Sequence, residues 1–116
     1  MTRRYALTQS ARRDLQAIDR YYVREAGIAT ADRILDIILT TLDRCATWPQ
    51  SGPLRPEIVP GIRSAPAAGY MIYFRPRPHG DGIQVMRVIH GARDQAAAFV
   101  RQRERVRQRN RPRAAR

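Results

Sequence analysis

Residues 8–47 read TQSARRDLQAIDRYYVREAGIATADRILDIILTTLDRCAT, and their apolar residues recur at helical spacing. Thr8 offers a side-chain cap for a first helix, expected over residues 9–26. Gly27 stands where a residue in the left-handed conformation would end that helix. The apolar residues of this helix form one narrow stripe: Ala11, Leu15, Ile18 and Tyr22.

The second half of this stretch predicts another helix, capped by Thr30 and ending near Thr47. Its apolar face is wider and comprises Ala31, Ile34, Leu35, Ile38, Leu42 and Cys45, flanked by Ile37 and Leu39. At about 100° per residue this face spans roughly 200°. We therefore expect the second helix to be buried more deeply than the first, between it and a sheet. The two helices should form an antiparallel hairpin.

Working outward toward the C-terminus, residues 49–61 contain four prolines and two glycines and predict an irregular connection. Three strand candidates follow, over residues 62–65, 70–75 and 83–89. The first is expected to stop at Pro66. The second and third are rich in branched and aromatic residues, and residues 76–82 should join them as a mobile hairpin loop.

The ends of the chain complete the predicted order. Residues 3–7 form a short strand candidate before the helices. The order of elements predicts an α+β fold: an N-terminal strand, an antiparallel two-helix hairpin and a three-stranded antiparallel meander, with the helices packed on one face of a mostly antiparallel sheet. A last helix could begin near Asp94. We expect one domain over residues 1–100 and a frayed or disordered basic tail over residues 101–116, which hold eight arginines and one acid.

The charge of the chain is its most unusual feature. The net charge is +12, and all 22 basic residues are arginine. Such a charge predicts acidic partners, either nucleic acid or an acidic protein. Cys45 is the only cysteine, so neither an internal disulfide nor zinc-type spacing occurs, and we expect no metal and no cofactor. Without an apolar signal core or membrane-length segment, we expect a cytoplasmic protein without membrane contact.

Several segments, taken in order, make residues 4–100 similar to the ParE branch of the ParE/RelE toxin superfamily. The opening carries Tyr5-Ala6-Leu7-Thr8, Ala11, Asp14-Leu15 and Ile18, and the second helix carries Ala31-Asp32-Arg33-Ile34 and Leu42. Trp48-Pro49, Gly52, Pro60-Gly61-Ile62-Arg63-Ser64, Tyr70, Ile72-Tyr73 and Arg75 follow. The strongest segment is Arg87-Val88-Ile89-His90-Gly91-Ala92-Arg93-Asp94. No single motif is diagnostic, but their joint order is specific.

This resemblance implies a toxin encoded beside an antitoxin that wraps and neutralises it. ParE toxins are associated with inhibition of DNA gyrase without being enzymes, whereas the RelE branch cleaves messenger RNA in the ribosomal A site. The implied partners are therefore a cognate ParD-like antitoxin and DNA gyrase. Because a shared fold cannot choose between the two activities, the choice rests on the site residues.

A nuclease site is the alternative to gyrase inhibition. RelE-type toxins tend to use lysines and arginines with a late tyrosine, but this chain has no lysine, and Tyr73 is its last tyrosine. His90 could act as a base or acid, with Arg63 and Arg93 supplying positive charge. The favoured role of His90 is nevertheless structural or partner-binding, and Asp94 is expected to cap the helix that follows it.

The predicted binding residues fall into two groups. The target surface is expected around Arg63, Arg75, Arg87, His90 and Arg93, and the antitoxin surface around Leu15, Ile18 and Tyr22. Arg87, on a strand, is expected to project from the open face of the sheet. The arginine tail is either solvated or a non-specific contact to nucleic acid. A third hypothesis is a basic binding module without toxicity.

Overall fold

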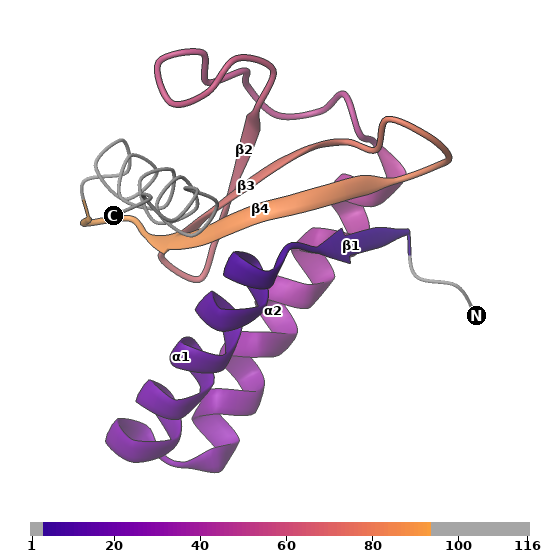
Figure 1. Ribbon diagram of the computed structural model, residues 1–116. Helices are drawn as coiled ribbons and strands as arrows, with labels where there is room; N and C mark the ends of the chain where they lie inside the picture. The colour runs from indigo at the N-terminus through magenta and orange to yellow at the C-terminus, as the bar shows by residue number, and fades with distance from the viewer. Residues whose placement is uncertain (1–3, 94–116) are drawn as a thin grey trace, which may run out of the picture.

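The computed structural model describes residues 4–93, and their two helices and four strands confirm the predicted α+β fold (Figure 1). The predicted last helix and the arginine tail lie outside the described residues. The elements in chain order are β1 (Tyr5–Leu7), α1 (Gln9–Ala26), α2 (Ile28–Thr47), β2 (Arg63–Ala67), β3 (Tyr70–Pro76) and β4 (Ile83–His90).

The four strands form one sheet in the order β1-β4-β3-β2. Strands β2, β3 and β4 make the antiparallel meander that the sequence predicts. Strand β1 joins this meander by pairing parallel to β4, with Tyr5 opposite Ile83 and Leu7 opposite Val85. The sheet is therefore mixed, and its first and last strands in the sequence lie side by side.

Both helices lie on one face of the sheet and point away from it as a hairpin (Figure 1). The prediction that α2 lies between α1 and the sheet is wrong, because α1 itself packs on β4 and β1 while α2 packs on β2 and β1. A single residue, Thr8, joins β1 to α1, so α1 starts beside β4. The greater burial of α2 is confirmed: six of its side chains are buried, against two in α1.

Two apolar clusters cover the two faces of the sheet. On the helix side, both helices contribute to a cluster whose fully buried members include Ile38, Leu42, Ile72, Phe74 and Val85. On the other face, Tyr73, Ile89 and Ile62 form a smaller cluster. Ile58 and Val59 of the irregular connection pack against this second cluster. The connection between α2 and β2 therefore shields part of the face that the helices leave open.

The ends of the helices follow the predicted capping residues in α1 but not in α2. The Thr8 hydroxyl accepts a hydrogen bond from the Ala11 amide at 3.1 Å, and Gly27 ends α1 at φ +93°. Helix α2 begins at Ile28 with Gly27 as its N-cap, so Thr30 is not the cap. Gly27 reverses the chain in one residue, which leaves no room for a separate cap.

Strand β2 is longer than predicted, because it continues through Pro66 to Ala67 instead of stopping at the proline. The strand lies at the edge of the sheet. Pro66 has no amide hydrogen to donate, and an edge strand tolerates this because the backbone groups on its outer side need no hydrogen-bond partner in the sheet.

Candidate partner-binding surfaces

Arg87 does not project from the open face of the sheet as predicted. Its Nε donates to Asp14 Oδ2 at 2.7 Å and its Nη2 to Asp14 Oδ1 at 3.1 Å, so the guanidinium and carboxylate form a two-point ion pair. The side chains are only 11% and 16% exposed. Tyr73, which pairs with Arg87, belongs to the open-face cluster, so the β4 backbone directs Arg87 toward that face and the ion pair with Asp14 draws its guanidinium toward α1.

The same carboxylate also completes the hydrogen bonding of β4. Beyond Val85, no strand of the described part of the chain pairs with β4 on the β1 side, because β1 ends at Leu7. Asp14 Oδ2 accepts the Val88 amide at 2.9 Å, and the Thr8 hydroxyl donates to the Met86 carbonyl at 2.9 Å. Two side chains from the start of α1 therefore take the place of a strand along this half of β4.

His90 ends β4 with an exposed side chain. Its Nδ1 accepts the Ala92 amide at 3.2 Å, and its ring packs edge to face on Tyr70 with centroids 5.2 Å apart. The Arg93 amide donates to the His90 carbonyl at 3.0 Å. These contacts give His90 a structural part in the turn that leaves β4. Asp94, predicted as a cap, lies outside the described residues.

Arg63 and Arg75 lie on different faces of the sheet. Arg63 pairs with Phe74 of the helix-side cluster and donates to the Gly52 carbonyl at 2.8 Å and to Gln50 Oε1 at 3.2 Å. Arg75, the next residue on β3, points to the opposite face because successive side chains alternate. There its Nε and Nη2 donate to Gln84 Oε1 at 3.2 and 3.1 Å.

The structure therefore does not bring the five predicted target residues together on one surface. Arg63 pairs at the Phe74 end of β3 and His90 at the Tyr70 end, four residues or ~13 Å apart along that strand. In the alternative nuclease set, Arg93 lies next to His90, but Arg63 is separated from both for the same reason. Contact of each of these residues with a target stays a prediction.

The predicted antitoxin stripe on α1 faces the interior of the protein. Ile18 is 6% exposed and belongs to the helix-side cluster, against which Leu15 and Tyr22 are partly buried. Tyr22 also forms a side-chain hydrogen bond with Tyr70. Burial, followed by this hydrogen bond, raises the pKa of Tyr70 to about 12. Only the outer edges of Leu15 and Tyr22 are available to a partner.

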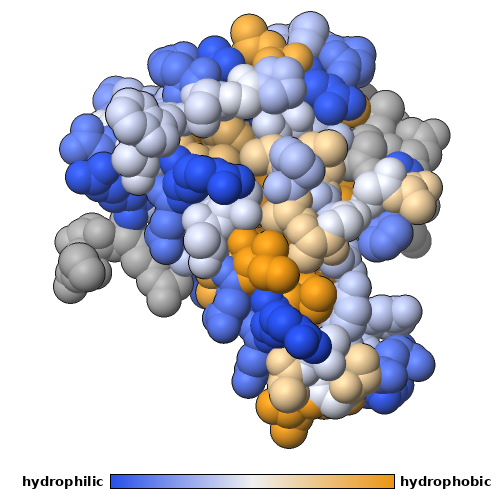
Figure 2. Space-filling view, turned by 180° about the vertical axis from the view of Figure 1, so that it is seen from behind, coloured by the Kyte–Doolittle hydropathy of each residue, from blue (hydrophilic) through white to orange (hydrophobic). Residues whose placement is uncertain are grey.

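Exposed apolar side chains instead gather around the end of the helical hairpin. Tyr21 is 50% and Ile28 68% exposed, and Val23 lies close to them in the sequence. Figure 2 shows hydrophobic residues at the free end of the hairpin and nearer the sheet, bordered by hydrophilic ones. Sequence periodicity missed this surface because it identifies the buried stripe and not the residues beside it.

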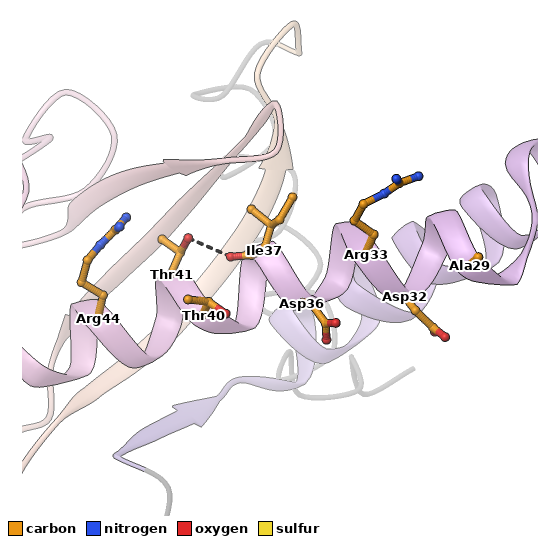
Figure 3. Close-up of a pocket in the computed structure, with 8 residues that line it drawn as sticks. All are labelled: Ala29, Asp32, Arg33, Asp36, Ile37, Thr40, Thr41 and Arg44. Atoms are coloured by element: carbon orange, nitrogen blue, oxygen red, sulfur yellow. Dashed lines mark hydrogen bonds between the residues drawn. The ribbon is translucent and has the colours of Figure 1, made fainter.

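The outer face of α2 carries a shallow groove with mixed charge (Figure 3). Ile37, 44% exposed, lies among charged and polar residues there, and its carbonyl accepts the Thr41 hydroxyl at 2.8 Å. The other residues that line the groove are Ala29, Asp32, Arg33, Asp36, Thr40 and Arg44.

Among the described residues, no helix is long and apolar enough to cross a membrane.

Comparison with known proteins decides the family. The model of the family described as "ParE toxin of type II toxin-antitoxin system, parDE" matches residues 5–95, which include every described helix and strand. The chain belongs to the ParE toxin family. The family resemblance seen in the sequence is therefore confirmed, and the sheet with its helical hairpin is the ParE fold.

A solved ParE-type structure agrees with this assignment. The chain is similar to a structure titled "Chromosomal ParDE TA system from P. aeruginosa", with 27% sequence identity and a TM-score of 0.62. The match covers 74% of this chain and 92% of the other. A comparison with curated proteins gives no match. The fold and the ParE assignment thus rest on both a sequence model and a structure.

Proposed function

We propose that this ParE-family chain acts as a toxin that inhibits DNA gyrase by protein–protein contact and is neutralised by a cognate ParD-like antitoxin. The observation that carries the proposal is the family match over residues 5–95, the whole described fold. The separation of Arg63 from His90 and Arg93 gives no support to the endoribonuclease alternative. The proposed toxin acts in the cytoplasm, where gyrase is found.

The antitoxin is proposed to bind along the helical hairpin. Tyr21 and Ile28 offer exposed apolar side chains there, and the partly buried Tyr22 packs edge to face on Tyr21. Leu15 and the buried Ile18 lie on α1 between this group and the sheet. An amphipathic helix binds through such apolar anchors. The net charge of +12 favours an acidic antitoxin segment and speeds its association.

The proposed function is tested by a gyrase supercoiling and DNA-cleavage assay on the purified full chain, with and without the neighbouring antitoxin. Inhibition with accumulation of cleaved DNA, reversed by the antitoxin, is the expected result. Folded protein that binds the antitoxin but leaves gyrase active would contradict the proposal. Cleavage of messenger RNA on ribosomes by the same preparation would then favour the endoribonuclease.

The antitoxin surface is tested separately by binding measurements. Replacing Tyr21 and Ile28 together by Asp should weaken antitoxin binding at least about tenfold, because two exposed apolar anchors are lost. Leu54→Asp is the matched control, since Leu54 is also exposed, at 52%, but lies in the connection after α2. Equal losses in both variants would argue against a hairpin site.

A further inference from the structure

A shallow hollow lies at one end of the sheet and includes residues of the loop from β3 to β4. Figure 1 shows where this loop turns. Its floor is a row across three strands, since Ala6 of β1 pairs with Gln84 of β4, which pairs with Arg75 of β3. Arg77, Pro78 and His79 of the loop complete its lining. The small Ala6 side chain lies beside Gln84 in this row.

The Arg75 guanidinium in this hollow is held in a fixed orientation, but no carboxylate of the described residues neutralises its charge. Gln84 Oε1 holds Nε and Nη2 of Arg75, and this neutral amide fixes the plane of the guanidinium. Arg24, Arg55 and Arg87 each pair with a carboxylate instead. Within residues 4–93, neither Arg75 nor Arg77 forms such an ion pair.

The chemistry of the hollow fits phosphate diesters. A fixed guanidinium presents donors in a planar fork that matches phosphate oxygens. Among residues 4–93, no large aliphatic side chain lines the hollow, as an amphipathic peptide would need for anchoring. No Tyr, Trp or Phe lines it either, as single-stranded nucleic acid would need for base stacking.

We propose that this hollow, centred on Arg75 and Arg77, binds the phosphate backbone of duplex DNA. The site gives the toxin a contact to DNA of its own. It goes beyond the contact with gyrase and does not depend on it. Phosphate contacts of this kind carry no sequence information, so binding is expected to be non-specific and strongly dependent on salt.

The test is fluorescence anisotropy of a labelled DNA duplex of about 20 base pairs, titrated with the full chain over a series of salt concentrations. Replacing Arg75 and Arg77 together by Gln removes two phosphate contacts. The slope of log affinity against log salt should become shallower by about 1.8, and affinity near 0.1 M salt should fall at least about tenfold. Thermal unfolding verifies that the variant is folded.

The control replaces Arg13 and Arg20 by Gln, two exposed arginines of α1. Both double variants lower the net charge from +12 by 2, to +10, so they differ only in where the charge is lost. The control should retain the wild-type slope. Equal slopes in the two double variants, or absence of duplex binding by the wild-type chain, would overturn the proposal.

Two further arms identify the ligand. Ala6→Glu places a carboxylate inside the hollow and should weaken duplex binding like the double variant, without removing an arginine. A single strand of the same length should bind less tightly than the duplex, since no aromatic stacking is available. Tighter binding of the single strand, or of a poly-glutamate peptide at equal charge, would overturn the assignment to duplex DNA. None of these measurements involves gyrase, so their failure is distinct from failure of the proposed function.

Discussion

Arg87 and Arg75 lie on neighbouring strands of one sheet, yet their surroundings differ completely. At the exit end of β4, the carboxylate of Asp14 neutralises Arg87 and the pair is nearly buried. At the hairpin end, the neutral amide of Gln84 orients Arg75 and leaves its charge exposed. The start of α1 makes the difference, because it supplies a carboxylate at one end only. We infer that one arginine stabilises the fold and the other serves a partner.

The largest effect is expected from removing Asp14. Asp14→Ala leaves the buried Arg87 charge without its carboxylate and the Val88 amide without its acceptor, and should lower the free energy of unfolding by about 3 kcal/mol. Urea denaturation measures this loss. Asp36→Ala on the exposed face of α2 is the control and should change stability by less than about 0.5 kcal/mol. Similar values for both variants would show that the ion pair does not stabilise the fold.

A smaller effect is expected from Thr8, the other side chain of the exit end that bonds to β4. Thr8→Val keeps the shape but loses the cap on the Ala11 amide and the bond to the Met86 carbonyl, at a cost of about 1.5 kcal/mol. The Thr30 hydroxyl accepts a hydrogen bond from the exposed Arg33 side chain, so Thr30→Val should cost less than about 0.5 kcal/mol. Urea denaturation of the two variants side by side compares these threonines directly.

The exit end should also be sensitive to alkaline pH through Tyr70. Its pKa is raised from an ordinary 10 to about 12 in the folded chain, so the folded state retains a proton that the unfolded state loses. This contribution to stability is complete below pH 10 and is lost as the pH rises to 12. Urea denaturation of Tyr70→Phe across this range should give a shallower decline than the wild type, and parallel curves would contradict this assignment.

The smallest effect on stability is expected at the hairpin end. Arg75→Gln removes an exposed charge that bonds to the neutral amide of Gln84, and should change the free energy of unfolding by less than about 0.5 kcal/mol. Arg87→Gln, at the other end, should be clearly less stable by thermal unfolding. A destabilised Arg75→Gln variant would remove the distinction between the two arginines.

Local patterns in the sequence predicted most of the elements. Apolar spacing and the capping hydroxyl of Thr8 placed α1 at its observed bounds, and Trp48 with Pro49 marked the end of α2. These signals are local, because each depends on residues within one or two turns of the chain. Thr30 misled the prediction, since Gly27 ends one helix and begins the next.

The candidate site was harder to predict, because its contacts join residues distant in the sequence. Asp14 contributed to the family resemblance, but its partner Arg87 lies 73 residues away, and no local pattern links them. A β-bulge opposite Tyr73 and Phe74 also interrupts the regular alternation of side chains between the two faces along β4. The exposure of Arg75, by contrast, agrees with alternation, since the pairing of β3 with β4 is regular from Phe74 to Pro76.

The parallel pairing of β1 with β4 has a consequence for the synthesis of the toxin. The partner of Tyr5 in the sheet is Ile83, which lies 78 positions later in the chain (83 minus 5). Strand β1 therefore cannot pair until β4 has been synthesised. Closing so long a loop is entropically costly and slows folding. A chain growing on the ribosome therefore cannot pair β1 until β4 has emerged. Prematurely terminated chains that lack β4 should consequently be unfolded and harmless to the cell that makes them.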